Sequence, residues 1–320
     1  MKGTLAAGLL LIALAAAAVP AAGQKWTAPQ TPWGHPDLQG LWTNATVTPF
    51  ERPAELADKP VLTEQEAAEF EKRFAQARDA DRRVGAGTDA DVALAYNQFW
   101  YDRGTKVVGS RRTSLVMDPP DGKVPALTAE GQKLADARAA ARRQSPADGP
   151  EDRPLAERCI LWPTAGPPMI PVGYNNNYQI FQTPDHVAIL IEMIHDVRII
   201  PLGAQPHASP GIRQWLGDSR GRWEGNTLVV TTTNFTNKTN FRGSDANLRL
   251  TERFTRVSAD TLNYEFTVDN PTAFTRPWTA AVPMTRTEGP LFEYACHEGN
   301  YGMTNLLRGA RAAEQVTEGR

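Results

Sequence analysis

The chain has 320 residues, of which 41% are hydrophobic and 8% aromatic, and its formal net charge is −2. This composition is that of a globular protein and excludes wholesale disorder. The near-neutral charge argues against nucleic-acid binding, because phosphate neutralisation needs a basic surface. The 25 prolines and 25 glycines favour a loop-rich β protein over a helical bundle.

Residues 1–23 predict a secretory signal peptide. Lys2 precedes an unbroken run of small apolar residues, Leu5–Val19, and small residues near Gly23 offer a cleavage site. The alternative is a membrane anchor, but the run is shorter than the roughly 20 residues that span a bilayer. We therefore expect a soluble mature protein in the bacterial periplasm or medium, without stable membrane insertion.

The only two cysteines, Cys159 and Cys296, predict one disulfide in an exported chain. A catalytic thiol is the alternative, but no local nucleophile signature surrounds either residue. The five histidines form no HxH, HxxxH or HExxH pair. The spacing therefore gives no reason to expect a metal, and the sequence implies no cofactor. The alternative is a metal site where histidines from several strand ends meet Glu192 or Glu298.

Residues 24–153 predict a Pro- and Trp-rich extended segment followed by two helices that pack on the main body. The extended part carries three indoles, Trp26, Trp33 and Trp42. Thr63 and Glu66 form a capping box ahead of the first helix, and Thr128 caps a second helix that ends near Arg143. Between these helices, Arg112–Met117 predicts a strand.

From Tyr178 onward, the hydrophobic pattern has a period of two. The expected strands are Tyr178–Gln182, His186–Ile194, Val197–Leu202, Thr227–Phe235, Leu248–Val257, Thr261–Asp269, Trp278–Arg286 and Leu291–Glu298. Consecutive short strands without intervening helices predict an antiparallel barrel or sandwich over residues 154–302. Residues 303–320 are expected to form a C-terminal helix, over Met303–Glu314, and a tail.

Four segments carry a resemblance to known proteins: TPWGHPDLQGLWTN, IRQWLGDSRGRWEGNTLVVTTTNF, LTERFTRVSADTLNYEFTVDNP and YACHEGNYGM. Together they resemble a family of exported bacterial proteins, common in proteobacteria and acidobacteria, to which no activity is assigned. The resemblance covers nearly the whole mature chain and implies no catalytic roles. The C-terminal half also looks lipocalin-like, which would imply a central pocket for a small molecule.

Two residues on adjacent strands are the first catalytic candidates. Glu252 and Tyr264 each share a strand face with apolar neighbours, and the turn at 258–260 places residue 254 opposite 264 and residue 252 opposite 266. A carboxyl group in an apolar interior suits acid/base chemistry. The alternative is that the carboxylate faces solvent or pairs with one of three arginines nearby in the sequence, Arg198, Arg222 or Arg253.

Three further residues are catalytic candidates. Glu192 is expected on an otherwise apolar strand face, while His195 and His297 stand at strand ends, each followed by an acidic residue. His195 with Asp196, or His297 with Glu298, could serve as an acid/base pair, and a buried Glu192 could act as a general acid or base. The alternative is that these residues make ordinary structural hydrogen bonds.

The densest cluster of polar and aromatic residues lies in the run from Trp215 to Gly225. It predicts either a structural corner or a ligand-binding rim. The candidate ligand-binding residues are Trp215, Asp218, Arg222, Trp223 and Asn234. The run does not match a serine-hydrolase elbow, because no helix follows it.

The sequence thus predicts an exported β-barrel that binds a small apolar or aromatic molecule, with groups suited to isomerase, lyase or hydratase chemistry. The alternative is a non-catalytic envelope protein with a structural or interaction role. A barrel filled by side chains, with carboxylates paired to arginine, would favour the second hypothesis. The sequence specifies neither the ligand nor the oligomeric state.

Overall fold

The computed structural model describes residues 26–82, 85, 87–88, 91, 97–162, 165–238 and 241–318. The expected signal peptide, residues 1–23, lies outside the described residues. Within the described part of the chain, no helix combines the length and apolar character needed to cross a membrane.

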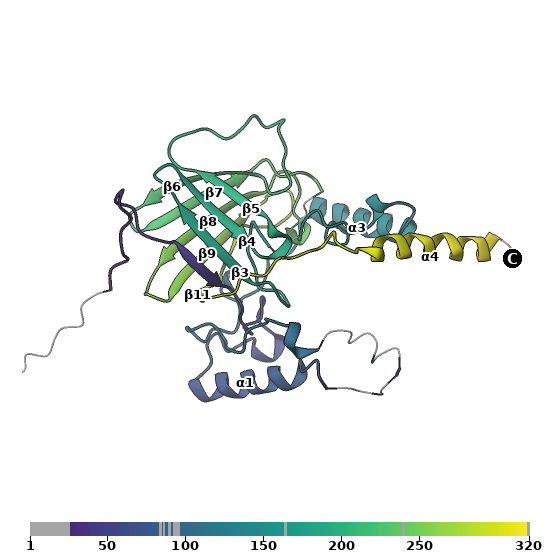
Figure 1. The fold of residues 1–320 in the computed structure, drawn as a ribbon, viewed down its shortest axis with the longest axis horizontal. Helices are drawn as coiled ribbons and strands as arrows, with labels where there is room; N and C mark the ends of the chain where they lie inside the picture. The colour runs from purple at the N-terminus through teal and green to yellow at the C-terminus, as the bar shows by residue number, and fades with distance from the viewer. Residues whose placement is uncertain are drawn as a thin grey trace, which may run out of the picture.

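An antiparallel sheet of 11 strands curls into a nearly closed barrel (Figure 1). Its strands follow the order β5 (Val197–Pro201), β4 (His186–Ile191), β3 (Asn177–Gln182), β1 (Gly40–Thr43), β11 (Met284–Arg286), β9 (Thr261–Asp269), β8 (Arg249–Arg256), β7 (Thr227–Thr233) and β6 (Asp218–Glu224). Two further strands, β10 (Trp278–Ala281) and β2 (Val116–Asp118), extend the sheet from β9. The predicted mainly β fold with a few helices is confirmed.

The barrel closes where β5 meets β6. These two strands run in parallel, and the amide of Gly203 donates to the carbonyl oxygen of Gly221 at 3.1 Å. The contact lies just after the end of β5, so the beginnings of β5 and β6 remain separated. A cavity of about 580 Å³ opens there, and Arg198 and Asp218 are among its lining residues.

The barrel interior is packed with side chains. The largest fully buried ones include Trp42, Tyr178, Phe254, Tyr264 and Trp278. Residues 165–170 add to this core from outside the sheet, since Ala165, Met169 and Ile170 belong to the same buried cluster. The centre of the barrel is therefore occupied where a lipocalin-like fold would imply a ligand.

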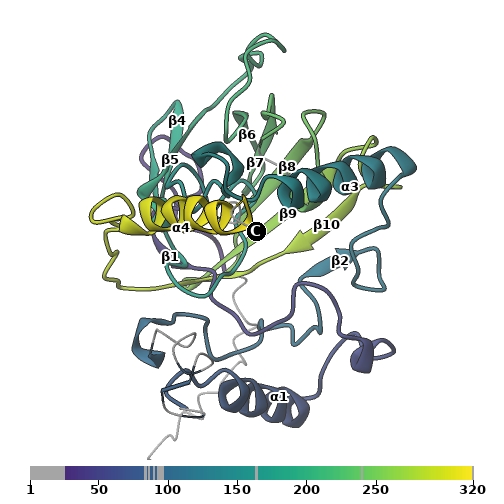
Figure 2. The same ribbon diagram turned by 90° about the vertical axis from the view of Figure 1, so that its right-hand side faces the viewer.

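Among the described residues, three helices lie outside the barrel. The capping box of Thr63 and Glu66 begins α1 (Glu64–Ala77), and Thr128 caps α3 (Ala129–Gln144), as predicted. Residues 301–318 form α4 (Tyr301–Glu318). Figures 1 and 2 show α3 and α4 projecting from one side of the barrel, whereas α1 lies on another side. Short 3-10 turns occur at Ala54–Leu56, Gln98–Trp100, Pro150–Asp152, Met193–His195 and Phe241–Gly243.

The predicted strand at Leu291–Glu298 is wrong. These residues form no strand, because β11 already pairs with β1 on one side and β9 on the other, so the sheet offers them no free position there. The single strand expected over Trp278–Arg286 is two strands, interrupted around Pro283, which has no amide hydrogen for the ladder.

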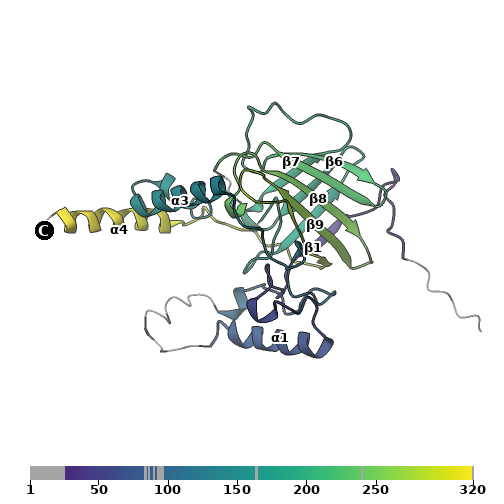
Figure 3. The ribbon, with the colours of Figure 1, turned by 180° about the vertical axis from the view of Figure 1, so that it is seen from behind.

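Two strands were not expected from the sequence. Gly40–Thr43 forms β1 and completes the barrel between β3 and β11, although it lies in the Pro-rich segment. Asp218–Glu224 forms β6, although its glycines and charges suggested a corner. Seen from behind, β6 stands with β7, β8 and β9 in one wall of the barrel (Figure 3).

Candidate functional site

Glu252 and Tyr264 point into the barrel from adjacent strands, as their sequence pattern predicts. Phe254 lies opposite Tyr264, and Glu252 lies opposite Phe266, in the expected register. The Tyr264 hydroxyl donates to Oε1 of Glu252 at 2.9 Å, and both residues are 0% exposed. The predicted pair therefore forms, and its surroundings decide what it can do.

Arg198 of β5 completes this buried cluster. Its guanidinium donates two hydrogen bonds to the Glu252 carboxylate, at 3.0 and 2.6 Å. The amide of Met169 donates to the Tyr264 hydroxyl at 3.0 Å, so the phenol is engaged on both sides. The carboxylate is therefore paired with an arginine, which is the alternative that the sequence left open.

The surroundings of this cluster favour a neutral Tyr264 and a charged Arg198. Burial raises the pKa of Tyr264 well above its ordinary value, and the negative charge of Glu252 raises it further. Burial alone would lower the pKa of Arg198, but the Glu252 carboxylate outweighs it and raises that pKa. A neutral phenol beside a closed ion pair suits a satisfied structural network more than proton exchange with a substrate.

Glu192 does not belong to the barrel interior. The inward row of β4 is Val187, Ile189 and Ile191, so the face predicted for Glu192 points outward, and the strand ends before it. Its carboxylate instead accepts hydrogen bonds from Asn177 and from the amide of Phe292, at 2.8 Å each. Glu192 thus anchors the C-terminal segment against β3.

The two candidate histidines are exposed. Nδ1 of His195 lies 3.0 Å from the carbonyl oxygen of Tyr294, and His297 lies in the loop where a strand was expected. Among the described residues, no group of three or more His, Cys, Asp or Glu side chains could hold a metal ion.

The candidate ligand-binding residues separate into different places. The buried carboxylate of Asp218 contacts the amide of Ala208 at 2.8 Å, Nδ1 of His207 at 3.0 Å and Arg220 at 2.6 Å. Burial would raise the pKa of Asp218, but these partners lower it overall. The side-chain amide of Asn234 donates to the carbonyl oxygen of Ala208 at 3.0 Å, so Asp218 and Asn234 both fix the loop that precedes β6.

Arg222 and Trp223 lie in β6, away from that loop. Arg222 is exposed and pairs with Glu224 at 2.7 Å. The Trp223 ring stacks on His35, with 5.1 Å between ring centroids. Of the five predicted ligand-binding residues, Trp215 and Asp218 line the cavity between the beginnings of β5 and β6. A second cavity lies at the end of the barrel, and Trp215 alone of the five lines it.

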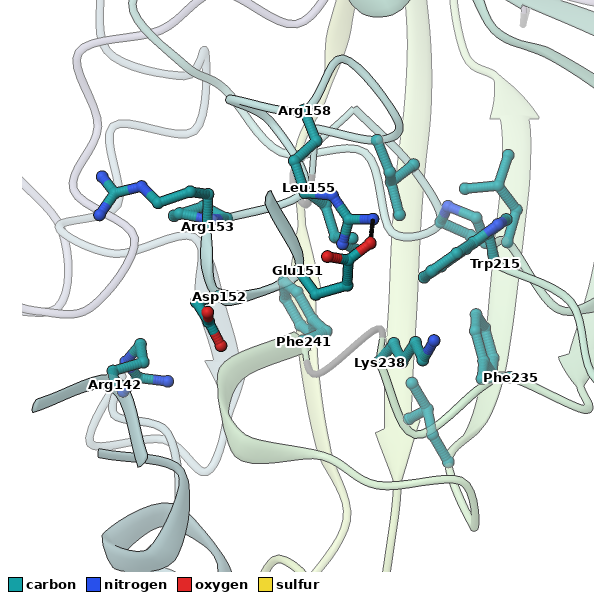
Figure 4. Close-up of a pocket in the computed structure, with 16 residues that line it drawn as sticks. Arg142, Glu151, Asp152, Arg153, Leu155, Arg158, Trp215, Phe235, Lys238 and Phe241 are labelled. Carbon is teal, nitrogen blue, oxygen red and sulfur yellow. Dashed lines mark ion pairs between the residues drawn. The ribbon is translucent and has the colours of Figure 1, made fainter. Parts of the chain in front are cut away.

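This end cavity has a volume of about 530 Å³ and lies between the barrel, the C-terminal part of α3 and the loop after it (Figure 4). Its apolar floor contains three buried side chains, Phe235, Phe241 and Leu248. Trp215 and Leu216 form one wall, and Leu155 stands on the other side. The charged lining residues are Arg142, Glu151, Asp152, Arg153, Arg158 and Lys238.

Sequence reasoning missed most of this cavity. Residues 144–153 looked like a polar boundary between two parts of the chain, and the available signal was the density of arginines and acids from Arg142 to Arg158. The aromatic floor comes from Phe235 and Phe241, on the segment that follows β7. Only the fold brings these two stretches together.

The disulfide is formed as predicted. Cys159 and Cys296 are bonded with their Cα atoms 5.7 Å apart, within the range that a disulfide requires. The bond joins the C-terminal segment to the loop that also supplies Leu155 and Arg158 to the cavity. It therefore fixes one wall of the cavity to the end of the chain.

The fold and the cavity together define a class: an antiparallel β-barrel with a packed interior and an aromatic-floored cavity at one end. Comparison with protein-family models, with curated proteins and with solved structures finds no match to this chain. The cavity is therefore the main indication of function.

Proposed function

We propose that this chain is an exported β-barrel protein that binds a small apolar or aromatic molecule in its end cavity. The observation that carries the proposal is the lining: an apolar floor and an indole wall enclose about 530 Å³ beneath a charged rim. Small-molecule sites are commonly hollows of roughly 300–1,000 Å³ with mostly apolar walls and few polar groups.

The proposed role is binding without acid/base turnover. A general acid or base must come within hydrogen-bond reach of the substrate atom. Glu252 is fully buried and held by Arg198 and Tyr264, and it is not among the residues that line the end cavity. The filled barrel and the arginine-paired carboxylate favour a non-catalytic protein.

Export is part of the proposal. The Cys159–Cys296 disulfide supports an oxidising compartment, because such bonds are rare in reducing cytosol. The apolar N-terminal run Leu5–Val19 supports the same destination. Both observations agree with a binding protein of the periplasm or medium.

The test is fluorescence titration with N-phenyl-1-naphthylamine, a neutral aromatic probe whose emission rises in apolar surroundings. Leu155 is half-buried on the loop side of the cavity, so Leu155→Trp should fill space without disturbing the barrel. We expect at least about tenfold weaker binding, because a bulky side chain would occupy the ligand volume.

Leu155→Met is the matched control, because it keeps the size and apolar character of the side chain. It should bind the probe as the unmodified protein does. Equal affinity in Leu155→Trp and Leu155→Met, with both proteins folded, would rule out the end cavity as the binding site.

A further inference from the structure

The charges around the end cavity are unevenly paired. Arg153 is fully engaged, since it donates to both carboxylate oxygens of Glu157 at 2.8 and 3.2 Å and to a backbone carbonyl at 2.7 Å. Asp152 accepts the amide of Gly149 at 2.8 Å. These two lining residues therefore have protein partners and offer little to a ligand.

Two cations of the rim have no such partner. Within the described residues, no ion pair of Lys238 or Arg142 is found. The ammonium of Lys238 lies 5.8 Å from the ring centroid of Trp215, so a cation–π contact holds it near the indole wall. Figure 4 shows Lys238 between Phe235 and Phe241, at the edge of the aromatic floor.

Arg158, a third cation of the rim, forms only a weak ion pair. Arg158 faces Glu151 across 3.7 Å, and the Glu151 side chain is 77% exposed. Exposed ion pairs of this kind contribute little free energy, so the anionic group of a ligand can replace the Glu151 carboxylate beside Arg158. The lining has four cations and two carboxylates. Because the Asp152 carboxylate already accepts the Gly149 amide, Glu151 is the main acidic group that a ligand anion would meet.

We infer that the ligand is an aromatic or apolar molecule with one anionic group, a carboxylate or sulfonate, placed beside Lys238. This inference rests on the proposed function and names the ligand class for the same cavity. The apolar part packs on Phe235 and Phe241, and its anion meets Lys238 and Arg158 at the rim. The attraction between the ligand anion and these two cations is stronger there than in open water, because the apolar walls exclude part of the water.

The experiment compares two probes that share an aromatic skeleton. N-phenyl-1-naphthylamine is neutral, and 8-anilinonaphthalene-1-sulfonate carries one negative charge. We expect the anionic probe to bind more tightly than the neutral probe. Raising the salt concentration should weaken only the anionic probe, because added ions screen charges at the rim.

Two variants should move the anionic affinity in opposite directions. Lys238→Gln should weaken sulfonate binding by about three- to tenfold, and Glu151→Gln should strengthen it by about two- to fivefold. Neither should change the affinity of the neutral probe by more than about twofold. Lys123→Gln, an exposed lysine that does not line the cavity, is the matched control and should change neither affinity.

The outcomes separate the two proposals. If neither probe binds, or if Leu155→Trp leaves both affinities unchanged, the proposed function fails. If both probes bind at this cavity with equal affinity, and Lys238→Gln and Glu151→Gln leave the sulfonate affinity unchanged, the inference about charge is overturned while the cavity remains a binding site. Melting temperatures close to that of the unmodified protein show that these surface variants are folded.

Discussion

At the scale of single residues, the fully buried ion pair of Arg198 and Glu252 dominates the barrel interior. Removing two charges from water costs several kcal/mol per ion, and good geometry is needed to offset this cost. Here the guanidinium makes two hydrogen bonds to the carboxylate, and Tyr264 adds a third. Each charge therefore needs the other, because either one alone would be buried without a counter-charge.

This reasoning predicts strong coupling between the two charges. Arg198→Met leaves an unpaired buried carboxylate and should lower the free energy of unfolding by about 3–5 kcal/mol. The double variant Arg198→Met/Glu252→Gln removes both charges and keeps an oxygen for the Tyr264 hydroxyl. It should recover at least about half of the loss, measured by urea denaturation at pH 7.

If the double variant is no more stable than Arg198→Met alone, the predicted coupling between the two charges is contradicted. Lys123→Gln provides a surface control, for which the free energy of unfolding should stay within about 0.5 kcal/mol of the starting value.

The position of Glu252 could be predicted from sequence, but its partner could not be singled out. The period-two rows of β8 and β9 put Glu252 and Tyr264 inward, because side-chain direction alternates along a strand. Several arginines were candidate partners. Arg253 follows Glu252 directly, yet it points outward and pairs with Glu224 at 3.0 Å. Arg198 reaches Glu252 only because the sheet curls until β5 faces β8 across the barrel.

At the scale of elements, the closure between β5 and β6 depends on a glycine. A Cβ atom at Gly221 would lie 2.7 Å from Cδ2 of Leu202 and 3.0 Å from Cγ2 of Ile200. These distances are shorter than van der Waals contact, so a side chain at this position would require the side chains of Leu202 and Ile200 to shift. The absence of a Cβ atom lets these two side chains pack directly against β6.

Gly221→Ala should therefore lower the free energy of unfolding by about 1–3 kcal/mol, the usual cost of overpacking. Leu202→Ala in the same chain should restore part of the loss, because it removes the clashing methyl group. Gly211→Ala is the matched control, since a Cβ there would meet nothing within 4 Å. Urea denaturation measures all three, and equal stability of Gly221→Ala and Gly211→Ala would contradict the steric argument.

Local pattern predicted those elements whose pairing is also local. The β8–β9 hairpin, the two helix N-caps at Thr63 and Thr128 and the C-terminal helix were visible because their signals lie within a few residues of one another. The strand expected at Leu291–Glu298 failed for a non-local reason, since both sides of β11 were already paired. The strand β1 was missed because its four residues, Gly40–Thr43, are too few to show a clear period within the Pro- and Trp-rich segment.

At the scale of the whole molecule, the disulfide decides how the C-terminal part is held. Besides the bond itself, hydrogen bonds hold this part, among them those of Tyr294 with His195 and of Asn300 with the carbonyl oxygen of Glu157. Arg311 of α4 donates to the carbonyl oxygens of Asp148 and Ala147, at 2.8 and 3.0 Å, and Glu192 accepts the amide of Phe292. Most residues of α4 are exposed, so little buried area holds the helix in place.

Replacing both cysteines with serine should release this part of the chain while the barrel stays folded. The bond closes a loop between residues 137 apart, and loop entropy alone predicts a loss of about 4–5 kcal/mol in the free energy of unfolding. Because little buried area holds α4, trypsin should cleave at Arg308 well before it cleaves the strands. Equal resistance to trypsin in the serine variant would mean that α4 is held by its own contacts.

In chains exported through the N-terminal segment, the intact mass should show the loss of about 21–23 residues and of the two thiol hydrogens. An intact Met1 in the exported fraction would contradict the signal peptide, and free thiols there would contradict the disulfide.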